Sequence, residues 1–226
     1  LLLSGRLPDN HIAEDMVEAW WQHSKTFAAV LVSCGVTTLT PALVSEQFNQ
    51  VNVAATLHFN DANEQIIYRQ AAMNGKDKVN VWLHHLLANC VYPSAITTHG
   101  FFYHEKLNQV VQVTLPPISD ANSLFTALLE FYLNGMQSPT CISCDLAEAV
   151  FGKKDRQGNY KTFEQQEFNQ YWHNSFSFNA PAFDKYYQYF YQQCPQWDDI
   201  KDDLTDCYLH MYNTITAAIT IVESSE

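Results

Sequence analysis

The stretch VNVAATLHFNDANEQIIYR, residues 51 to 69, decides the fold. From Val51 to Phe59, apolar residues alternate with polar or small ones, and this period of two predicts a half-buried strand. Residues 60–63 are Asn, Asp, Ala and Asn, a composition typical of turns. Gln65–Arg69 predicts a second strand. The two segments together therefore predict a β-hairpin with a loop of several residues.

Elements on both sides of this hairpin extend the prediction. A helix is expected over about 13–32, and another follows Asn74, which is a suitable cap with Asp77 three residues later. Two further strands are expected over Thr97–Tyr103 and Gln109–Leu115, and the remainder is mostly helical, with a long last helix running through Ile219. This order predicts an α/β fold with a mixed central sheet flanked by helices and extra C-terminal helices. We expect one domain over residues 1–226, cut from a longer chain because the sequence does not begin with Met.

Composition and charge limit the class of protein. The chain has 226 residues, of which 47% are hydrophobic, as in globular proteins. The longest apolar runs are shorter than the roughly 18 residues needed to cross a bilayer. The formal net charge is −12, from 24 acidic and 12 basic residues, so strong DNA binding by this chain alone is not expected. Six cysteines without a secretion signal favour reduced thiols and a cytoplasmic location.

Three stretches resemble the last third of the RecC family, the gamma subunit of exodeoxyribonuclease V. They are Ser4–Pro8, followed by an acidic residue and a Trp-containing helix; Ile67–Arg69, followed by Val81–Leu86; and Leu115–Pro117, followed by Leu128–Tyr132, Asn134–Met136 and Ser138–Pro139. The resemblance lies in the order and spacing of these motifs, because each motif alone has low specificity. It implies a fold like that of the metal-dependent PD-(D/E)XK nucleases.

The resemblance also implies that the catalytic positions are degenerate. An active member carries an acidic residue on one strand of the hairpin, and Asp or Glu, one residue and Lys on the other. On this chain these positions fall at His58, Ile67 and Arg69, so only the cation is retained. Isoleucine offers no metal ligand, and histidine is a poor ligand for Mg²⁺. We therefore expect no catalytic and no metal-binding residues here, and the replacements His58→Asp, Ile67→Asp and Arg69→Lys to create a Mg²⁺ site.

The expected function is that of a non-catalytic subunit domain in exodeoxyribonuclease V, the RecBCD helicase–nuclease of recombinational double-strand break repair. The family implies help with DNA-end binding, strand separation and hotspot recognition, next to RecB-like and RecD-like subunits, on double- and single-stranded DNA. Mg²⁺ and ATP would be used by those partners, with no cofactor in this domain. One alternative is an active Mg²⁺ nuclease with migrated ligands, for which Asp61, Glu64 and Glu46 would have to converge. Another is a pure protein-interaction module, which the acidic balance favours.

Two further groups of residues are candidates for a site. The basic residues of one polar loop, together with Arg69, are candidate DNA contacts: Lys153, Lys154, Arg156 and Lys161. Cys141 and Cys144 have the C-x-x-C spacing of half a zinc site or a redox pair, but the sequence has no second C-x-x-C. Incidental cysteines are the favoured interpretation.

Overall fold

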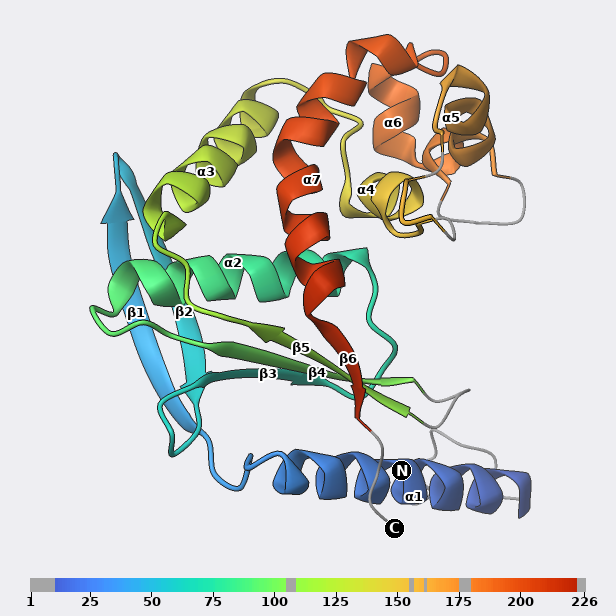
Figure 1. Ribbon diagram of the computed structural model, residues 1–226. Coiled ribbons are helices and arrows are strands. Elements are labelled where there is room, and N and C mark those ends of the chain that lie inside the picture. Colours follow the sequence, from blue (N-terminus) through green and yellow to red (C-terminus); the bar gives the residue numbers. More distant parts are fainter. Residues whose placement is uncertain (1–10, 105–108, 155–156, 161, 175–179, 223–226) are drawn as a thin grey trace. The chain divides into compact units, whose positions relative to one another are not determined.

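Six strands form one mixed sheet in the order β1-β2-β3-β4-β5-β6 (Figure 1). The computed structural model describes residues 11–104, 109–154, 157–160, 162–174 and 180–222. The chain forms two compact units, one made of residues 1–73, 91–117 and 218–226, the other of residues 74–90 and 118–217. The predicted α/β class with a mixed sheet is confirmed. That the two units make one domain stays a prediction.

The first unit holds the sheet and one long helix. Its elements are α1 (His11–Ser33), β1 (Thr40–Phe48), β2 (Val51–Phe59), β3 (Gln65–Arg69), β4 (Thr98–His104), β5 (Gln109–Leu115) and β6 (Ile219–Val222). Strands β1, β2 and β3 are antiparallel neighbours, β3 and β4 are parallel, and β4, β5 and β6 are again antiparallel. The four strands expected from the sequence are therefore present, with bounds within one residue of those predicted.

Two strands were not predicted. Strand β1 contains Pro41, which has no N–H to donate, and it is tolerated because β1 lies at the edge of the sheet. Strand β6 corrects the prediction of one long last helix through Ile219, because the helix ends at Ala218 and the next four residues pair with β5. The sequence of β6, Ile-Thr-Ile-Val, is β-branched throughout, which suits a strand once a neighbouring strand is available.

Helix α1 buries one side against one face of the sheet. Phe27 and Val30 are 4% and 1% exposed. They belong to one buried cluster with residues of β3, β4 and β5: Ile66, Phe101, Tyr103 and Val110. The ring of Phe27 lies 6.0 Å from that of Tyr103 and 6.4 Å from that of Tyr68, as centroid distances. Burial of these side chains holds α1 to the sheet, because each fully buried large apolar side chain stabilises by roughly 1.5–3 kcal/mol.

The second unit is helical. Its elements are α2 (Gly75–Val91, whose last residue belongs to the first unit), α3 (Ala121–Gln137), α4 (Cys144–Phe151), α5 (Gln165–Trp172), the 3₁₀ turn Pro181–Phe183, α6 (Lys185–Phe190), the 3₁₀ turn Trp197–Asp199 and α7 (Lys201–Ala218). The cap predicted for α2 is confirmed, since Asn74 Oδ1 accepts from the Asp77 N–H and Asp77 Oδ2 accepts from the Asn74 N–H. Among the described helices, none is long and apolar enough to cross a membrane.

Candidate functional site

The hairpin of β2 and β3 is joined by a turn that one side chain organises. Asn60 Oδ1 accepts from the backbone N–H groups of Ala62 and Glu64, at 3.1 and 2.8 Å. Asn63 adopts a left-handed conformation with φ of 61°, which asparagine tolerates better than most residues. The turn closes with Phe59 paired directly opposite Gln65. This pairing fixes which side chains of the two strands share a face.

The register separates His58 and Ile67, the two positions that the resemblance aligns with acidic residues. Directly paired residues point to the same face of a sheet, and successive residues alternate between faces. Phe59 and Gln65 therefore share a face with Ile67, whereas His58 lies on the opposite face with Ile66. His58 is exposed and Ile67 is half-buried. The structure thus does not bring His58 and Ile67 together, because the length of the turn shifts their pairing by one residue.

Arg69 ends β3 on the same face as Ile67. Its side chain is exposed, and its Nη2 donates to the carbonyl oxygen of Ala72 at 2.7 Å. This hydrogen bond holds the guanidinium over the segment that follows β3. The Arg69 cation, at the position that the resemblance aligns with a lysine, is therefore turned toward the end of the strand.

The carboxylates nearest the hairpin have other partners. Thr38 Oγ1 donates to Asp61 Oδ1 at 2.6 Å. Glu64 Oε2 accepts from Asn60 Nδ2 at 3.0 Å and lies 3.4 Å from His99 Nε2. The hydrogen bond from Asn60, and next the nearby His99, hold the pKa of the Glu64 carboxyl below its usual value. Glu46 pairs with Val53 on β2, six residues before the turn, which corresponds to about 20 Å along the strand.

A comparison with known protein families shows the family to which the chain belongs. A family model for the RecC C-terminal domain matches residues 1–155, more than half of the 226 residues. The chain belongs to the RecC C-terminal domain family. No curated protein sequence matches it.

Family membership confirms the resemblance inferred from the motifs. It makes this RecC C-terminal domain part of a RecC-type subunit of exodeoxyribonuclease V, the RecBCD complex of DNA repair and recombination, with RecB and RecD as partner subunits. The matched residues include the whole β2–β3 hairpin and its turn. The hairpin that carries His58, Ile67 and Arg69 therefore lies within the part of the chain that matches the family.

The basic loop of the RecC C-terminal domain is only partly described. Lys153 is exposed. Lys154 Nζ lies 3.2 Å from Asn213 Oδ1 and 4.6 Å from the centre of the Tyr160 ring, so its charge is engaged within the loop and α7. Arg156 and Lys161 lie outside the described residues. As DNA contacts, these four residues stay a prediction.

The C-x-x-C pair is placed at the start of α4. Cys141 is buried, and burial raises the pKa of its thiol to about 11. Cys144 is half-buried, with its Sγ 4.0 Å from the Tyr208 hydroxyl. In the part of the chain that the structure describes, no group of three or more His, Cys, Asp or Glu side chains is placed to hold a metal ion. A thiol with so high a pKa stays protonated near neutral pH and is a poor nucleophile and a poor ligand, so Cys141 favours the interpretation of incidental cysteines.

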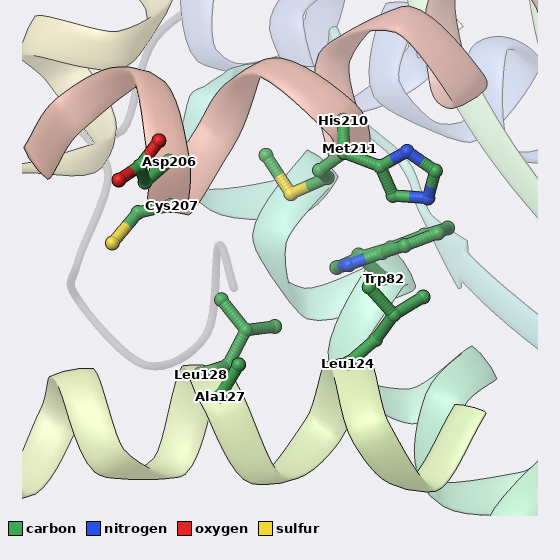
Figure 2. Close-up of a pocket in the computed structure, with 8 residues that line it drawn as sticks. All are labelled: Trp82, Leu124, Ala127, Leu128, Asp206, Cys207, His210 and Met211. Carbon is green, nitrogen blue, oxygen red and sulfur yellow. The ribbon is translucent and has the colours of Figure 1, made fainter. Parts of the chain in front are cut away.

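An apolar cavity lies within the second unit, with a volume of about 150 Å³ (Figure 2). Trp82 of α2 lies between residues of α3 and of α7; the remaining lining residues are Leu124, Ala127, Leu128, Asp206, Cys207, His210 and Met211. Burial, and next the carboxylates of Asp203 and Asp206, raise the pKa of the Cys207 thiol to about 12. Small-molecule sites usually measure about 300–1,000 Å³, so this cavity is too small for a nucleotide.

A buried charge in the second unit was missed by the sequence analysis. Lys78 of α2 is 6% exposed, and its Nζ lies 2.9 and 2.7 Å from the two carboxylate oxygens of Glu148 on α4. Tyr212 of α7 donates to Glu148 Oε2 at 2.9 Å, and burial together with this carboxylate raises the pKa of Tyr212. The available signal was the position of Lys78, four residues before Trp82 on the buried side of α2. These three residues therefore join the helices α2, α4 and α7.

The register leads to a prediction about the hairpin. The replacements His58→Asp, Ile67→Asp and Arg69→Lys in the intact subunit are expected to create no Mg²⁺ site, contrary to the expectation from sequence, because the two carboxylates would lie on opposite faces. Calorimetric titration with Mg²⁺ measures this, with His58→Asp alone as the matched control. Stronger Mg²⁺ binding by the triple variant than by the single one would contradict the observed register.

Proposed function

We propose that this RecC C-terminal domain is a non-catalytic, nuclease-like part of its subunit that helps the complex to bind a DNA end and to separate the strands. Recognition of the recombination hotspot is a contribution of the subunit as a whole. In this proposal the chain uses no cofactor, and the partner subunits use Mg²⁺ and ATP. The family match and the hairpin at which such nucleases carry their ligands support the proposal.

One observation carries the non-catalytic part of the proposal. Near the turn, neither face of the β2–β3 pair presents two carboxylates. This holds for any pairing of the two strands that is used to locate the catalytic positions. One face offers Phe59, Gln65 and Ile67. The opposite face offers His58, Ile66 and Tyr68. Mg²⁺ in phosphoryl-transfer sites is held by carboxylates, and none of these six side chains is one.

The alternative of an active nuclease with migrated ligands finds less support. It requires Asp61, Glu64 and Glu46 to converge, but Glu46 lies far along β1 from the turn. Asp61 is hydrogen-bonded to Thr38, and Glu64 is hydrogen-bonded to Asn60 and lies beside His99.

The alternative of a pure interaction module is favoured by the net charge of −12, since neutralisation of phosphates dominates the affinity of proteins for DNA.

Two measurements test the proposal. The intact RecC-type subunit, purified without its partners, is expected to show no chelator-sensitive cleavage of linear DNA with Mg²⁺ or Mn²⁺. Chelator-sensitive cleavage that follows the subunit through purification would overturn the non-catalytic assignment.

The second measurement concerns contact with DNA. In the assembled complex, photo-crosslinking of a duplex end with single-stranded tails is expected to give adducts within residues 1–226. If crosslinks form elsewhere in the complex and none forms in this chain, the pure interaction module is the correct interpretation.

A further inference from the structure

The first unit contains a cleft at the carboxyl ends of the parallel strands β3 and β4. Its volume is about 580 Å³, within the range of about 300–1,000 Å³ common for ligand sites. It is lined by residues of α1, of the segment after β3 and of the end of β4: Trp20, His23, Ser24, Gln70, Ala71, Ala72, Tyr103 and His104. Ligands of α/β sheets often bind beyond the carboxyl ends of parallel strands.

The lining combines aromatic rings with neutral hydrogen-bonding groups. The side chain of Trp20 is 40% exposed, so its ring is accessible from the solvent. The rings of His23 and Tyr103 contact each other, with their centroids 5.6 Å apart. The Ser24 hydroxyl lies 3.0 Å from Gln70 Oε1 and 2.8 Å from the carbonyl oxygen of Trp20, so these two oxygens share its one proton. Nδ1 of His104 is buried and has no hydrogen-bond partner in the described part of the chain. A buried polar atom of this kind is a candidate to meet a ligand.

The charge at the cleft is unlike that of the chain as a whole. Among the residues that the structure describes, none of the eight that line the cleft is a carboxylate, although the chain carries 24 acidic residues. Arg69 is not one of the described lining residues, but its Nη2 donates to the carbonyl oxygen of Ala72, which is. The cleft therefore offers an aromatic platform, neutral polar groups and one nearby cation.

We propose that this cleft binds a base of single-stranded DNA, with the base stacked on Trp20 and an adjacent phosphate beside Arg69. The inference rests on the proposed role of the domain at a DNA end and names the site within it. Stacking on an aromatic side chain is the main sequence-tolerant mode by which proteins hold single strands. Gln70 and His104 supply hydrogen-bonding groups at the edge of the base, and Arg69 supplies the charge that the phosphate requires. Mg²⁺ and other hard cations fit the described lining poorly, because it includes no carboxylate.

The neighbouring Trp21 provides a matched control. It is 57% exposed, more than Trp20, but it does not line the cleft, and Lys25 Nζ lies 5.0 Å from the centre of its ring. Successive residues of a helix point about 100° apart, so Trp21 faces another direction. The replacements Trp20→Ala and Trp21→Ala remove the same side chain from adjacent exposed positions, and only the first changes the cleft.

The experiment measures binding of a duplex end with single-stranded tails by the assembled complex without ATP, using fluorescence anisotropy. Trp20→Ala is expected to weaken this binding about tenfold, the loss expected for one stacked base. Trp21→Ala is expected to leave the affinity within about twofold, and Trp20→Phe to keep most of it, since phenylalanine retains a stacking face. A blunt duplex end, which offers no unpaired base, is expected to bind both alanine variants alike.

Crosslinking of tails that carry 5-iododeoxyuridine separates the possible failures. Adducts on the cleft residues, lost in Trp20→Ala, are the expected result. Adducts elsewhere in residues 1–226 together with unchanged affinity of Trp20→Ala would overturn the cleft assignment while the proposed role at DNA ends stands. No adduct in this chain would overturn the proposed role as well. If thymidine monophosphate quenched the fluorescence of Trp20 and the tailed duplex end did not, the cleft would be a site for a free nucleotide. That result would contradict the proposal.

Discussion

Replacing Lys78 with methionine is expected to lower the free energy of opening of α2, α4 and α7 by about 3 kcal/mol. Lys78 is almost fully buried and meets both carboxylate oxygens of Glu148, which also accepts from the Tyr212 hydroxyl. Methionine preserves the packing of the stem but leaves the half-buried carboxylate of Glu148 without its cation. The cost comes mainly from that unpaired carboxylate, because its desolvation is no longer offset.

Hydrogen exchange of the intact subunit, followed by mass spectrometry, measures the opening of these helices directly. Lys76→Met is the matched control, since Lys76 is exposed on the same turn of α2 and its loss is expected to change stability by less than about 0.5 kcal/mol. The double replacement Lys78→Met with Glu148→Gln is expected to recover part of the loss, because the glutamine amide oxygen still accepts from Tyr212 without carrying a charge. Equal exchange in the Lys78→Met and Lys76→Met variants would show that the pair does not stabilise this unit.

Replacing Phe27 with alanine is expected to destabilise the attachment of α1 to the sheet by about 3–5 kcal/mol. Phe27 is 4% exposed and lies in the cluster that joins α1 to β3, β4 and β5. The replacement removes its ring contacts with Tyr68 and Tyr103 and leaves a cavity that neighbouring strands of a hydrogen-bonded sheet cannot readily fill. Because α1 also carries Trp20, His23 and Ser24, this variant is expected to weaken the cleft as well.

The measurement is hydrogen exchange within His11–Ser33, compared with exchange in β4. Phe27→Leu keeps most of the volume and is expected to cost less than about 1.5 kcal/mol. Val32→Ala lies on the same helix at a position 57% exposed and serves as the surface control, with an expected change under about 0.5 kcal/mol. If α1 exchanged no faster in Phe27→Ala than in Val32→Ala, the packing of this helix on the sheet would be refuted.

The sequence by itself determined the elements whose pattern is local. Alternation over Val51–Phe59 predicted β2, and the Asn74–Asp77 cap predicted the start of α2, because each depends on residues within a few positions of one another. That β2 and β3 contain no Asp or Glu was also readable, since the side chains of a strand are known once its bounds are. The family followed from motif order, and the match over residues 1–155 confirmed it.

Only the tertiary structure decided what depends on pairing between distant segments. The chain around Pro41 and the Ile219–Val222 segment have weak or misleading local patterns, and they are strands because neighbouring strands satisfy their backbone groups. The cleft gathers Trp20, His23 and Ser24 with residues 70–72 and 103–104, which no sequence spacing links. The tertiary structure also decided that His58 and Ile67 lie on opposite faces of the sheet. Alternation of side chains is a property of one strand, whereas the register between two strands is set by the turn that joins them.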